Sequence, residues 1–295
     1  MAKIVSIASG KGGVGKSFFA ANIAMSMVSK GYRVLLVDGD LGGANLHNFV
    51  GLRASGRGLY NFLRDKTSLA DVILESSFGV HFIGGSGDVL GMAHINNFEK
   101  LKILNQLKRT DYEYVILDLG AGTSYNMVDF FNFSDKRVLV MTSEPTSIEN
   151  SYGFLKVALY RKIERLLIKD KRMEDICKKL RSRSMNYPKV ADIIEEADGI
   201  DSKATDDIRK ILKNYNVGLV LNMLKFKKEL NIFFGFEKVT EKYLSIAIEK
   251  LGFVPYDIKV SDYVKNLNPY YSAVGKEQKL YFDEIRDILV SSMRG

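Results

Sequence analysis

The sequence of 295 residues has one cysteine, three histidines and no apolar run of membrane-spanning length. Cys177 alone rules out an intramolecular disulfide and a multi-thiolate metal site within one chain. His47, His81 and His94 are not spaced as metal ligands. No run reaches the roughly 18 apolar residues that a transmembrane helix needs, and the opening MAKIVSIASG lacks the apolar region and cleavage site of a signal peptide. These absences predict a soluble, cytoplasmic chain.

The charge of the chain is concentrated in one segment. The formal net charge is +8, and residues 160–189 carry +7 of it, with eleven basic and four acidic side chains. Such a basic face can meet nucleic acid, anionic lipid or an acidic partner, and it can equally be a solvated helix surface. Its basic residues are Arg161, Lys162, Arg165, Lys169, Lys171, Arg172, Lys178, Lys179, Arg181, Arg183 and Lys189.

Apolar runs bounded by turns alternate with helical patterns along the chain. Runs such as VLLV and YVILDL are apolar almost throughout, which is typical of parallel strands covered on both faces. This alternation predicts an α/β fold with a doubly wound, mostly parallel sheet that binds ligands at the carboxyl ends of its strands. The expected strands are Lys3–Ala8, Arg33–Asp38, Val80–Ile83, Tyr114–Leu119, Arg137–Thr142, Val217–Asn222 and Gly252–Pro255.

Helices are expected between the strands, most clearly at Lys16–Lys30, Asn97–Lys108 and Thr146–Ile168. Residues 160–215 are long, charged and helical in pattern, and we interpret them as a helical elaboration between two strands rather than a separate domain. A last helix is expected over residues 276–293. The whole chain, residues 1–295, is therefore predicted to form a single domain.

The stretch SGKGGVGKSF, residues 9–18, contains a complete G-x-x-x-x-G-K-[ST] phosphate-binding loop between an expected strand and an expected helix. In this motif backbone N–H groups cradle phosphates, the lysine reaches the β- and γ-phosphates, and the hydroxyl binds Mg²⁺. Lys16 and Ser17 match those two roles, and Lys11 is an additional lysine. The predicted nucleotide-binding residues are Gly10, Lys11, Gly12, Gly13, Val14, Gly15, Lys16, Ser17 and Phe18.

Two further strand ends carry aspartates. VLLVDGDLGGAN places Asp38 and Asp40 after one strand, and YVILDLGAG places Asp118 after another. Carboxylates beside a phosphate loop can hold Mg²⁺ through water or orient an attacking water. Each motif alone would be weak, because aspartates are common in strand-end turns. Beside an intact phosphate loop they predict a metal site made by Ser17, Asp38 and Asp118.

Together these residues resemble a known family. Lys11 within KGGVGKS is similar to the additional lysine of the deviant Walker A ATPases, the MinD/ParA group. The DGD string at Asp38 and the DLGAG string at Asp118 resemble the two switch segments of that group. The resemblance implies the P-loop NTPase fold, Mg-dependent ATP hydrolysis and an ATP-bridged homodimer in which Lys11 reaches the partner's nucleotide. It also implies that Lys11, Lys16 and Asp40 are catalytic, with Asp40 positioning the attacking water.

Further positions follow from the same resemblance. Asn222, at the end of VGLVLN, matches the adenine-contacting position, with a strand-end cap as its alternative role. Pro255 and Tyr256 in GFVPYD resemble the loop that closes over the base. SEPTSIENSY resembles the segment near the dimer interface, where Glu144 is the candidate contact. The strings DLGGANLH, FIGGSG and EPTSIENSYGFLK resemble the FlhG/FleN branch, whose members regulate flagellar placement and number.

The resemblance implies a regulatory ATPase that acts through a protein partner of unknown identity. The alternative is a ParA-type partition ATPase that binds DNA non-specifically through segment 160–189. Peripheral association with the inner membrane is less favoured, because residues 276–294 carry four basic and four acidic side chains and a neutral helix gains little from anionic lipid. We expect this helix to pack on the protein's own core. An iron–sulfur carrier would need paired cysteines, and nothing in the sequence indicates the acceptor pocket of a metabolic ligase or kinase.

Overall fold

The structure is a computed structural model that describes residues 1–40, 43, 45–53, 56–65, 67–85, 95–182 and 187–294. Some sequence features fall outside the described residues. They are His94, Arg183 of the basic segment, and parts of the DLGGANLH and FIGGSG strings.

One eight-stranded sheet forms the centre of the molecule, with the strand order β3-β4-β2-β5-β1-β6-β7-β8. All neighbouring strands pair in parallel except β3 and β4, which are antiparallel. This confirms the predicted doubly wound, mostly parallel sheet. The strands are β1 (Lys3–Ala8), β2 (Val34–Asp38), β3 (Leu74–Glu75), β4 (His81–Ile83), β5 (Tyr114–Asp118), β6 (Lys136–Met141), β7 (Val217–Leu224) and β8 (Ile248–Pro255).

The two edges of the sheet differ most from the sequence prediction. The short strand β3 was not predicted, because two residues carry no readable alternation. Strand β8 begins at Ile248 rather than at Gly252, since its first residues include half-buried charged side chains. Strand β7 continues past Asn222, so the predicted strand end at Asn222 is wrong. Its pairing with β8 is irregular between Leu221 and Leu224, where Met223 has φ of 60°.

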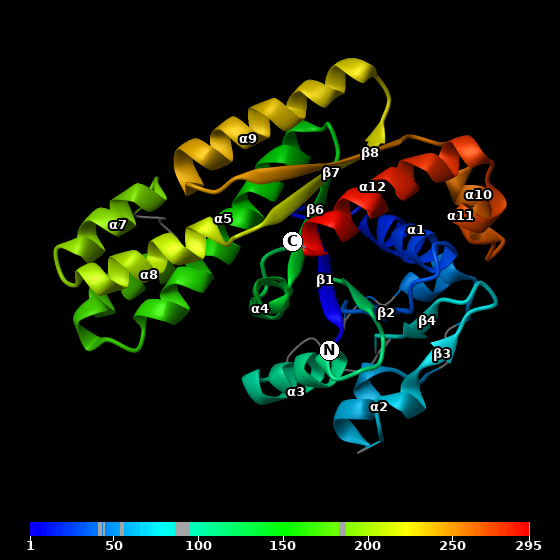
Figure 1. The fold of residues 1–295 in the computed structure, drawn as a ribbon, viewed down its shortest axis with the longest axis horizontal. Coiled ribbons are helices and arrows are strands. Elements are labelled where there is room, and N and C mark those ends of the chain that lie inside the picture. Colours follow the sequence, from blue (N-terminus) through cyan, green and yellow to red (C-terminus); the bar gives the residue numbers. More distant parts are fainter. Residues whose placement is uncertain are drawn as a thin grey trace.

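Helices cover both faces of the sheet (Figure 1). The α-helices are α1 (Lys16–Ser29), α2 (Leu59–Arg64), α3 (Asn97–Lys108), α4 (Tyr125–Phe133), α5 (Pro145–Leu167), α6 (Glu174–Arg181), α7 (Val190–Asp198), α8 (Ser202–Lys213), α9 (Asn231–Leu244), α10 (Val260–Lys265), α11 (Tyr270–Ala273) and α12 (Lys276–Arg294). Short 3-10 helices are η1 (Leu46–Val50), η2 (Ala70–Val72), η3 (Lys171–Met173) and η4 (Lys227–Leu230).

Successive residues of the central strands supply two separate apolar clusters. In β1, Ile4 and Ala8 pack with buried residues of α3, α4, α5 and the helices up to α9. Val5 and Ile7 point to the other face and pack with α1, η1, α11 and α12. Alternate side chains of a strand point to opposite faces, so one apolar strand serves both clusters. This explains why the central strands read as continuous apolar runs.

Residues 160–215 fold as the end of α5 followed by η3, α6, α7 and α8. Buried apolar residues on these helices, among them Ile163, Ile176, Val190 and Ile208, join the same cluster as the rest of α5. Many of the basic side chains here form ion pairs with neighbouring acids. The paired residues include Arg172 with Asp170 and Asp201, Lys178 with Glu174 and Asp175, Lys179 with Glu196, and Arg181 with Glu164.

The C-terminal helix α12 packs on α1 and β8, as the sequence predicted. Phe282, Ile285 and Leu289 are almost completely buried in the cluster that contains α1. Arg286 donates to the backbone carbonyl and hydroxyl of Ser26 on α1. Within the described part of the chain, no helix has both the length and the apolar character needed to cross a membrane.

Deletion of residues 276–295 is expected to lower the melting temperature strongly or to prevent folding. Phe282, Ile285 and Leu289 each contribute about 1.5–3 kcal/mol by leaving water, and the deletion also exposes the face of α1 on which α12 packs. Thermal unfolding followed by circular dichroism measures the effect. An unchanged melting temperature combined with lost liposome binding would instead restore the membrane-targeting interpretation of this helix.

Candidate nucleotide-binding site

The carboxyl ends of the central strands open into a cleft of about 680 Å³. Strand β1 leads into the loop that precedes α1, and β2 and β5 end beside it. Most of the predicted phosphate-loop residues line the cleft, namely Lys11, Gly12, Gly13, Val14, Gly15, Lys16, Ser17 and Phe18. Gly10 does not line it; a side chain there would collide with the backbone of Asn150 at the start of α5.

The phosphate loop requires glycine at its turn into α1. Gly13 and Gly15 have φ of 81° and 79°, a left-handed conformation that side chains rarely tolerate. A Cβ atom at Gly15 would also collide with the side-chain amide of Asn222. That amide donates to the carbonyl of Val14 at 2.8 Å. Asn222 therefore buttresses the phosphate loop from β7.

Lys16 lies at the N-terminus of α1 and is almost buried. Its Nζ donates to Oδ1 of Asp118 at 2.7 Å, and the two side chains are 9% and 1% exposed. The Ser17 hydroxyl lies 3.5 Å from the same ammonium. Burial raises the pKa of the Asp118 carboxyl, and the Lys16 charge acts in the opposite direction. The loop lysine, the hydroxyl and the aspartate from β5 thus come together as predicted by the motif.

Asp38 lies directly across the sheet from Asp118, as its register partner on β2. Its two carboxylate oxygens accept the backbone N–H groups of Asp40 and Leu46 at 3.1 Å each. Burial, and next the nearby Asp118 carboxylate, raise the pKa of Asp38 to about 7. Two acids held this close in a buried site favour a bound cation, because a cation stabilises both charged forms.

The raised pKa of Asp38 predicts a pH-dependent stability in the absence of nucleotide and Mg²⁺. The unfolded chain releases this proton near pH 4 and the folded chain only near pH 7, so the Asp38 contribution falls as pH rises through that window. The loss is at most about 4 kcal/mol, at 1.36 kcal/mol for each pKa unit.

Asp38→Asn imitates the protonated acid and provides the comparison. It is expected to unfold at a higher temperature than wild type at pH 8, with the difference shrinking towards pH 4. Differential scanning calorimetry in EDTA measures both proteins. A difference that stays constant across this range would contradict the assigned titration of Asp38.

Lys11 lies at the mouth of the cleft and faces the start of α5. Its Nζ contacts Oε2 of Glu144 and the hydroxyl of Thr146, both at 3.0 Å. The Lys11 and Glu144 side chains are 39% and 65% exposed. The structure therefore brings together the additional lysine and the acid that the sequence singled out near the expected dimer interface, and both remain accessible to a second molecule.

Asp40 lines the cleft, as expected for a residue that positions water. Its carboxylate lies against Gly120 in the turn after β5, where a Cβ atom would approach the Asp40 Cγ to 3.2 Å. Asp40 and the turn that follows Asp118 thus lie against each other beside the phosphate loop. Asp38 and Asp118 lie beneath the cleft and do not line it.

The far wall of the cleft contains residues that sequence reasoning missed. Of the predicted base-contacting residues, Asn222 and Tyr256 line the cleft, whereas Pro255 does not. Met223, which follows Asn222, lines the cleft. Its backbone has a φ of 60°, which is unusual for a residue with a side chain. Further apolar lining on this side comes from Phe49, Ile258, Val260 and Val264. These residues carry no motif, and only their position just after Tyr256 or near the switch segment could have drawn attention to them.

The side chains present fit a magnesium–nucleotide complex. The glycine loop leaves room at Gly12 and Gly13, where an added Cβ would meet nothing within 4 Å. Among the described residues no three acidic, imidazole or thiol side chains form a ready-made metal cage. Mg²⁺ does not need one, since it usually keeps several waters and binds through one or two carboxylates and the substrate phosphates. Ser17, Asp38 and Asp118 are the residues that would hold it.

Comparison with known proteins agrees with this geometry. The family model of the CobQ/CobB/MinD/ParA nucleotide binding domain matches residues 5–270. The chain belongs to this family. The match spans the phosphate loop, both aspartate segments and Asn222, and it confirms the predicted relationship to the MinD/ParA-type P-loop ATPases.

Two curated relatives match the chain over more than half of its length. The flagellum site-determining protein YlxH of Helicobacter pylori is 33% identical over 168 residues, which are 56% of this chain and 57% of that protein. The antiactivator FleN of Pseudomonas aeruginosa is 25% identical over 274 residues, which are 92% of this chain and 80% of that protein. The matched part therefore covers just over half of YlxH and most of FleN.

Solved structures share the fold at low sequence identity. The septum site-determining protein MinD of Pyrococcus horikoshii, complexed with Mg-ADP, superposes with a TM-score of 0.67 at 18% identity over 100% of this chain and 99% of that one. A ParA family ATPase of Chlorobium tepidum superposes with a TM-score of 0.62 at 17% identity, with 98% of each chain covered. These likenesses concern the fold.

Proposed function

We propose that this chain is a Mg-dependent regulatory ATPase that dimerises with ATP, resets by hydrolysis and addresses a protein partner in its dimeric form. The observation that carries the proposal is the position of Lys11. Lys16 lies at the inner end of the phosphate loop, where it forms an ion pair with Asp118. Lys11 lies at the mouth of the cleft, where it contacts Glu144 and Thr146 at the start of α5. A second cation in that place suits the nucleotide of a facing subunit.

Each polar residue of the cleft has a separate task in this proposal. Lys16 binds the phosphates of its own subunit, and backbone N–H groups of the loop orient them. Asp40 positions the attacking water from the cleft wall. Lys11 stabilises developing charge on the phosphates across the dimer. Ser17 and the buried aspartates would hold Mg²⁺, which would neutralise phosphate charge when bound.

A flagellar role is the finer part of the proposal. It is supported by the strings that resemble the FlhG/FleN branch, by the flagellar name of the YlxH relative and by the match to FleN. We infer that the chain controls the placement or number of a cellular structure, with flagella as the first candidate. Flagellar counts by electron microscopy in cells that lack the chain test this point.

The experiment that tests the proposed switch compares nucleotides on the purified wild-type protein. Light scattering is expected to show a larger dimer fraction with ATP and Mg²⁺ than with ADP. Turnover is expected without any added acceptor molecule, which separates this function from that of a metabolic ligase or kinase. A protein that stays monomeric with ATP, or that hydrolyses ATP only when a small acceptor is supplied, would contradict the proposal.

Non-specific DNA binding through segment 160–189 remains the second candidate. The segment carries +7, but Arg172, Lys178, Lys179 and Arg181 are each paired with an acid. Such pairing lowers the charge available to phosphates and favours a solvated structural surface.

Reversal of Arg172, Lys178, Lys179 and Arg181 to Glu decides between these two roles. ATP turnover is expected to stay near the wild-type rate, because the four residues lie outside the cleft. Retention on random-sequence duplex DNA with ATP is expected to be weak in both proteins. If the wild type instead binds DNA strongly, loses it at raised salt and loses it on reversal, the DNA-binding function is correct.

A further inference from the structure

A second hollow, of about 360 Å³, lies between α3, α4 and α5 and shares no lining residue with the nucleotide cleft. Part of its wall is apolar and comes from α3, α4, α5 and α8. Leu101 on α3 is 49% exposed in this wall, although most large apolar residues of the chain are buried. The apolar lining consists of Leu101, Leu104, Phe133, Leu166 and Ile211.

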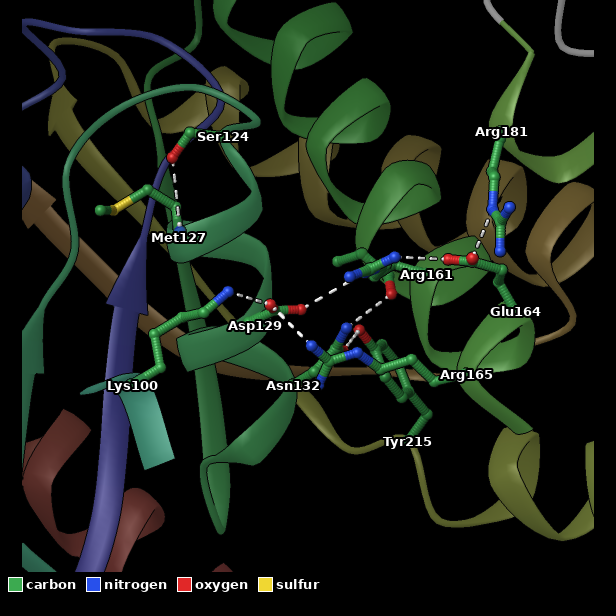
Figure 2. Close-up of polar contacts among 11 residues, drawn as sticks. Lys100, Ser124, Met127, Asp129, Asn132, Arg161, Glu164, Arg165, Arg181 and Tyr215 are labelled. Carbon is green, nitrogen blue, oxygen red and sulfur yellow. Dashed lines mark hydrogen bonds and ion pairs between the residues drawn. The ribbon is translucent and has the colours of Figure 1, made fainter. Parts of the chain in front are cut away.

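Basic side chains outnumber acids around the hollow. Asp129 on α4 accepts from Lys100 at 2.6 Å, from Arg165 at 2.7 Å and from Arg161 at 3.4 Å. Figure 2 shows these three cations converging on the one carboxylate. The second acid, Glu164, is shared between Arg161 and Arg181. Two carboxylates thus pair with four cations, and Lys162 and Arg137 add two further positive charges.

Among the described residues, Lys162 and Arg137 form no ion pair with an acid within 4.0 Å, and Asp135 acts on Arg137 only from a greater distance. The Lys162 ammonium and the Arg137 guanidinium both donate to the carbonyl oxygen of Asn132, at 3.1 Å each. Arg137 is only 7% exposed, stacks on Tyr215, and leaves its Nε without a hydrogen-bond partner. Burial lowers the pKa of Lys162, and the nearby charges of Arg137 and Arg165 lower it further. A neutral carbonyl does not balance two cations, so the cluster favours an added anion.

We propose that this hollow binds an acidic segment of a protein partner, with a carboxylate against Lys162 and Arg165 and flanking apolar side chains on Leu101, Leu104 and Phe133. The inference deepens the proposed regulatory function, since it gives the chemistry of the partner. A carboxylate suits the cluster because Asp129 already shows that geometry with Arg165. A polyphosphate strand or a lipid surface suits it less, because Asp129 and Glu164 repel dense negative charge and the apolar wall is concave.

Two helices, α4 and α5, run from the neighbourhood of the nucleotide cleft to the hollow. Its α4 wall begins just after the turn that follows Asp118, with the Ser124 hydroxyl accepting the Met127 N–H at the helix start (Figure 2). Its α5 wall begins at Pro145, directly after the Glu144 that contacts Lys11. Both helices therefore start beside segments that border the nucleotide cleft and end at the hollow, so a partner bound in the hollow would lie at the far ends of these two helices.

The test uses the full chain without nucleotide and a phage library of random dodecapeptides. Enriched peptides are expected to carry Asp or Glu beside Leu or Phe. Their affinity, measured by fluorescence polarisation, is expected to fall about thirtyfold or more in Lys162→Glu, which places a carboxylate in the site and repels the incoming one. Leu101→Ser is expected to weaken binding by roughly tenfold, as expected for removing a large apolar contact.

Matched controls are available in the turn after α5 and on α3. Lys169→Glu changes an exposed lysine of the same basic segment, and Phe98→Ser removes an exposed apolar residue of α3 that is not part of the lining. Both are expected to bind the peptides like wild type. Lys162→Gln, which removes the charge without adding an acid, guards against a misfolded Lys162→Glu protein, and thermal unfolding verifies every variant.

The proposal is overturned if no acidic peptide is enriched, or if Lys162→Glu and Lys162→Gln bind the peptides as tightly as wild type. It is also overturned if the two Lys162 variants instead lose binding to phosphatidylglycerol vesicles or duplex DNA. Because no nucleotide is present in the assay, failure here leaves the ATP-driven dimer untouched. Failure of dimerisation likewise leaves peptide binding to be judged on its own.

Discussion

Lys11→Ala is expected to remain monomeric in ATP and Mg²⁺ and to lose nearly all ATP turnover while it still binds ATP. Lys16 serves the nucleotide of its own subunit from a buried position, so removal of Lys11 leaves that contact in place. Phosphoryl transfer depends on positioning and charge stabilisation, and a cation supplied in trans contributes about 10³–10⁵ in rate. Light scattering, calorimetry and phosphate release measure the three properties separately.

Two variants serve as comparisons for Lys11→Ala. Asp40→Ala is expected to accumulate as a persistent dimer, because it keeps the lysine but loses the residue that positions water. Glu144→Gln removes the carboxylate that holds Lys11 in the single chain and is expected to keep substantial turnover, since the exposed pair contributes little to stability. If Lys11→Ala dimerises and hydrolyses ATP normally, Lys11 is only a loop residue and the dimer switch is wrong.

Lys16→Ala is expected to lose measurable ATP binding and also to be less stable. The phosphates lose a charge-assisted hydrogen bond worth about 1.5–3 kcal/mol. In addition, the Asp118 side chain is 1% exposed, and Lys16 is the cation that pairs with it among the described residues. In the variant the Asp118 carboxyl would therefore stay buried beside Asp38 without that cation. Breaking a buried ion pair on one side costs about 3–5 kcal/mol. Calorimetric titration and urea unfolding measure the two effects.

The double variant Lys16→Ala/Asp118→Asn separates binding from stability. It is expected to regain much of the lost stability, because the unpaired buried charge is gone, while ATP binding stays absent. Lys100→Ala is the matched control, since it breaks another buried lysine–aspartate pair, with Asp129 at 2.6 Å. It is expected to cost stability without weakening ATP binding. Unchanged ATP affinity in Lys16→Ala would remove the basis for the phosphate loop.

The residues at the inner end of the cleft could be predicted from the sequence because each of them belongs to a short local motif. A phosphate loop needs its glycines, lysine and hydroxyl in consecutive positions, so SGKGGVGKSF contains the whole unit. Asp38 and Asp118 each end an apolar run, and parallel strands bring their carboxyl ends to one edge of a sheet. The structure adds that the two strands are neighbours and that Asp38 and Asp118 are register partners.

The residues of the opposite wall of the cleft could not be predicted from the sequence, since they come from distant segments without a shared pattern. Met223 lines the cleft because β7 is irregular beside β8, and Pro255 is held in the sheet, away from the lining, by the same pairing. Val260 and Val264 reach the cleft through the packing of α10 against η1. The positions of these lining residues depend on how strands and helices from distant parts of the sequence pack together.

The sequence by itself determined the fold class and was enough to predict the phosphate loop, the candidate metal ligands and the additional lysine, because periodicity and motif spacing are properties of neighbouring residues. Only the tertiary structure decided which charges meet. It placed Lys11 on Glu144, paired much of the basic segment with acids, and left Lys162 and Arg137 sharing one carbonyl oxygen. Electrostatic energies depend on distance and burial rather than on order along the chain, so the charge count of a segment does not predict its free charge.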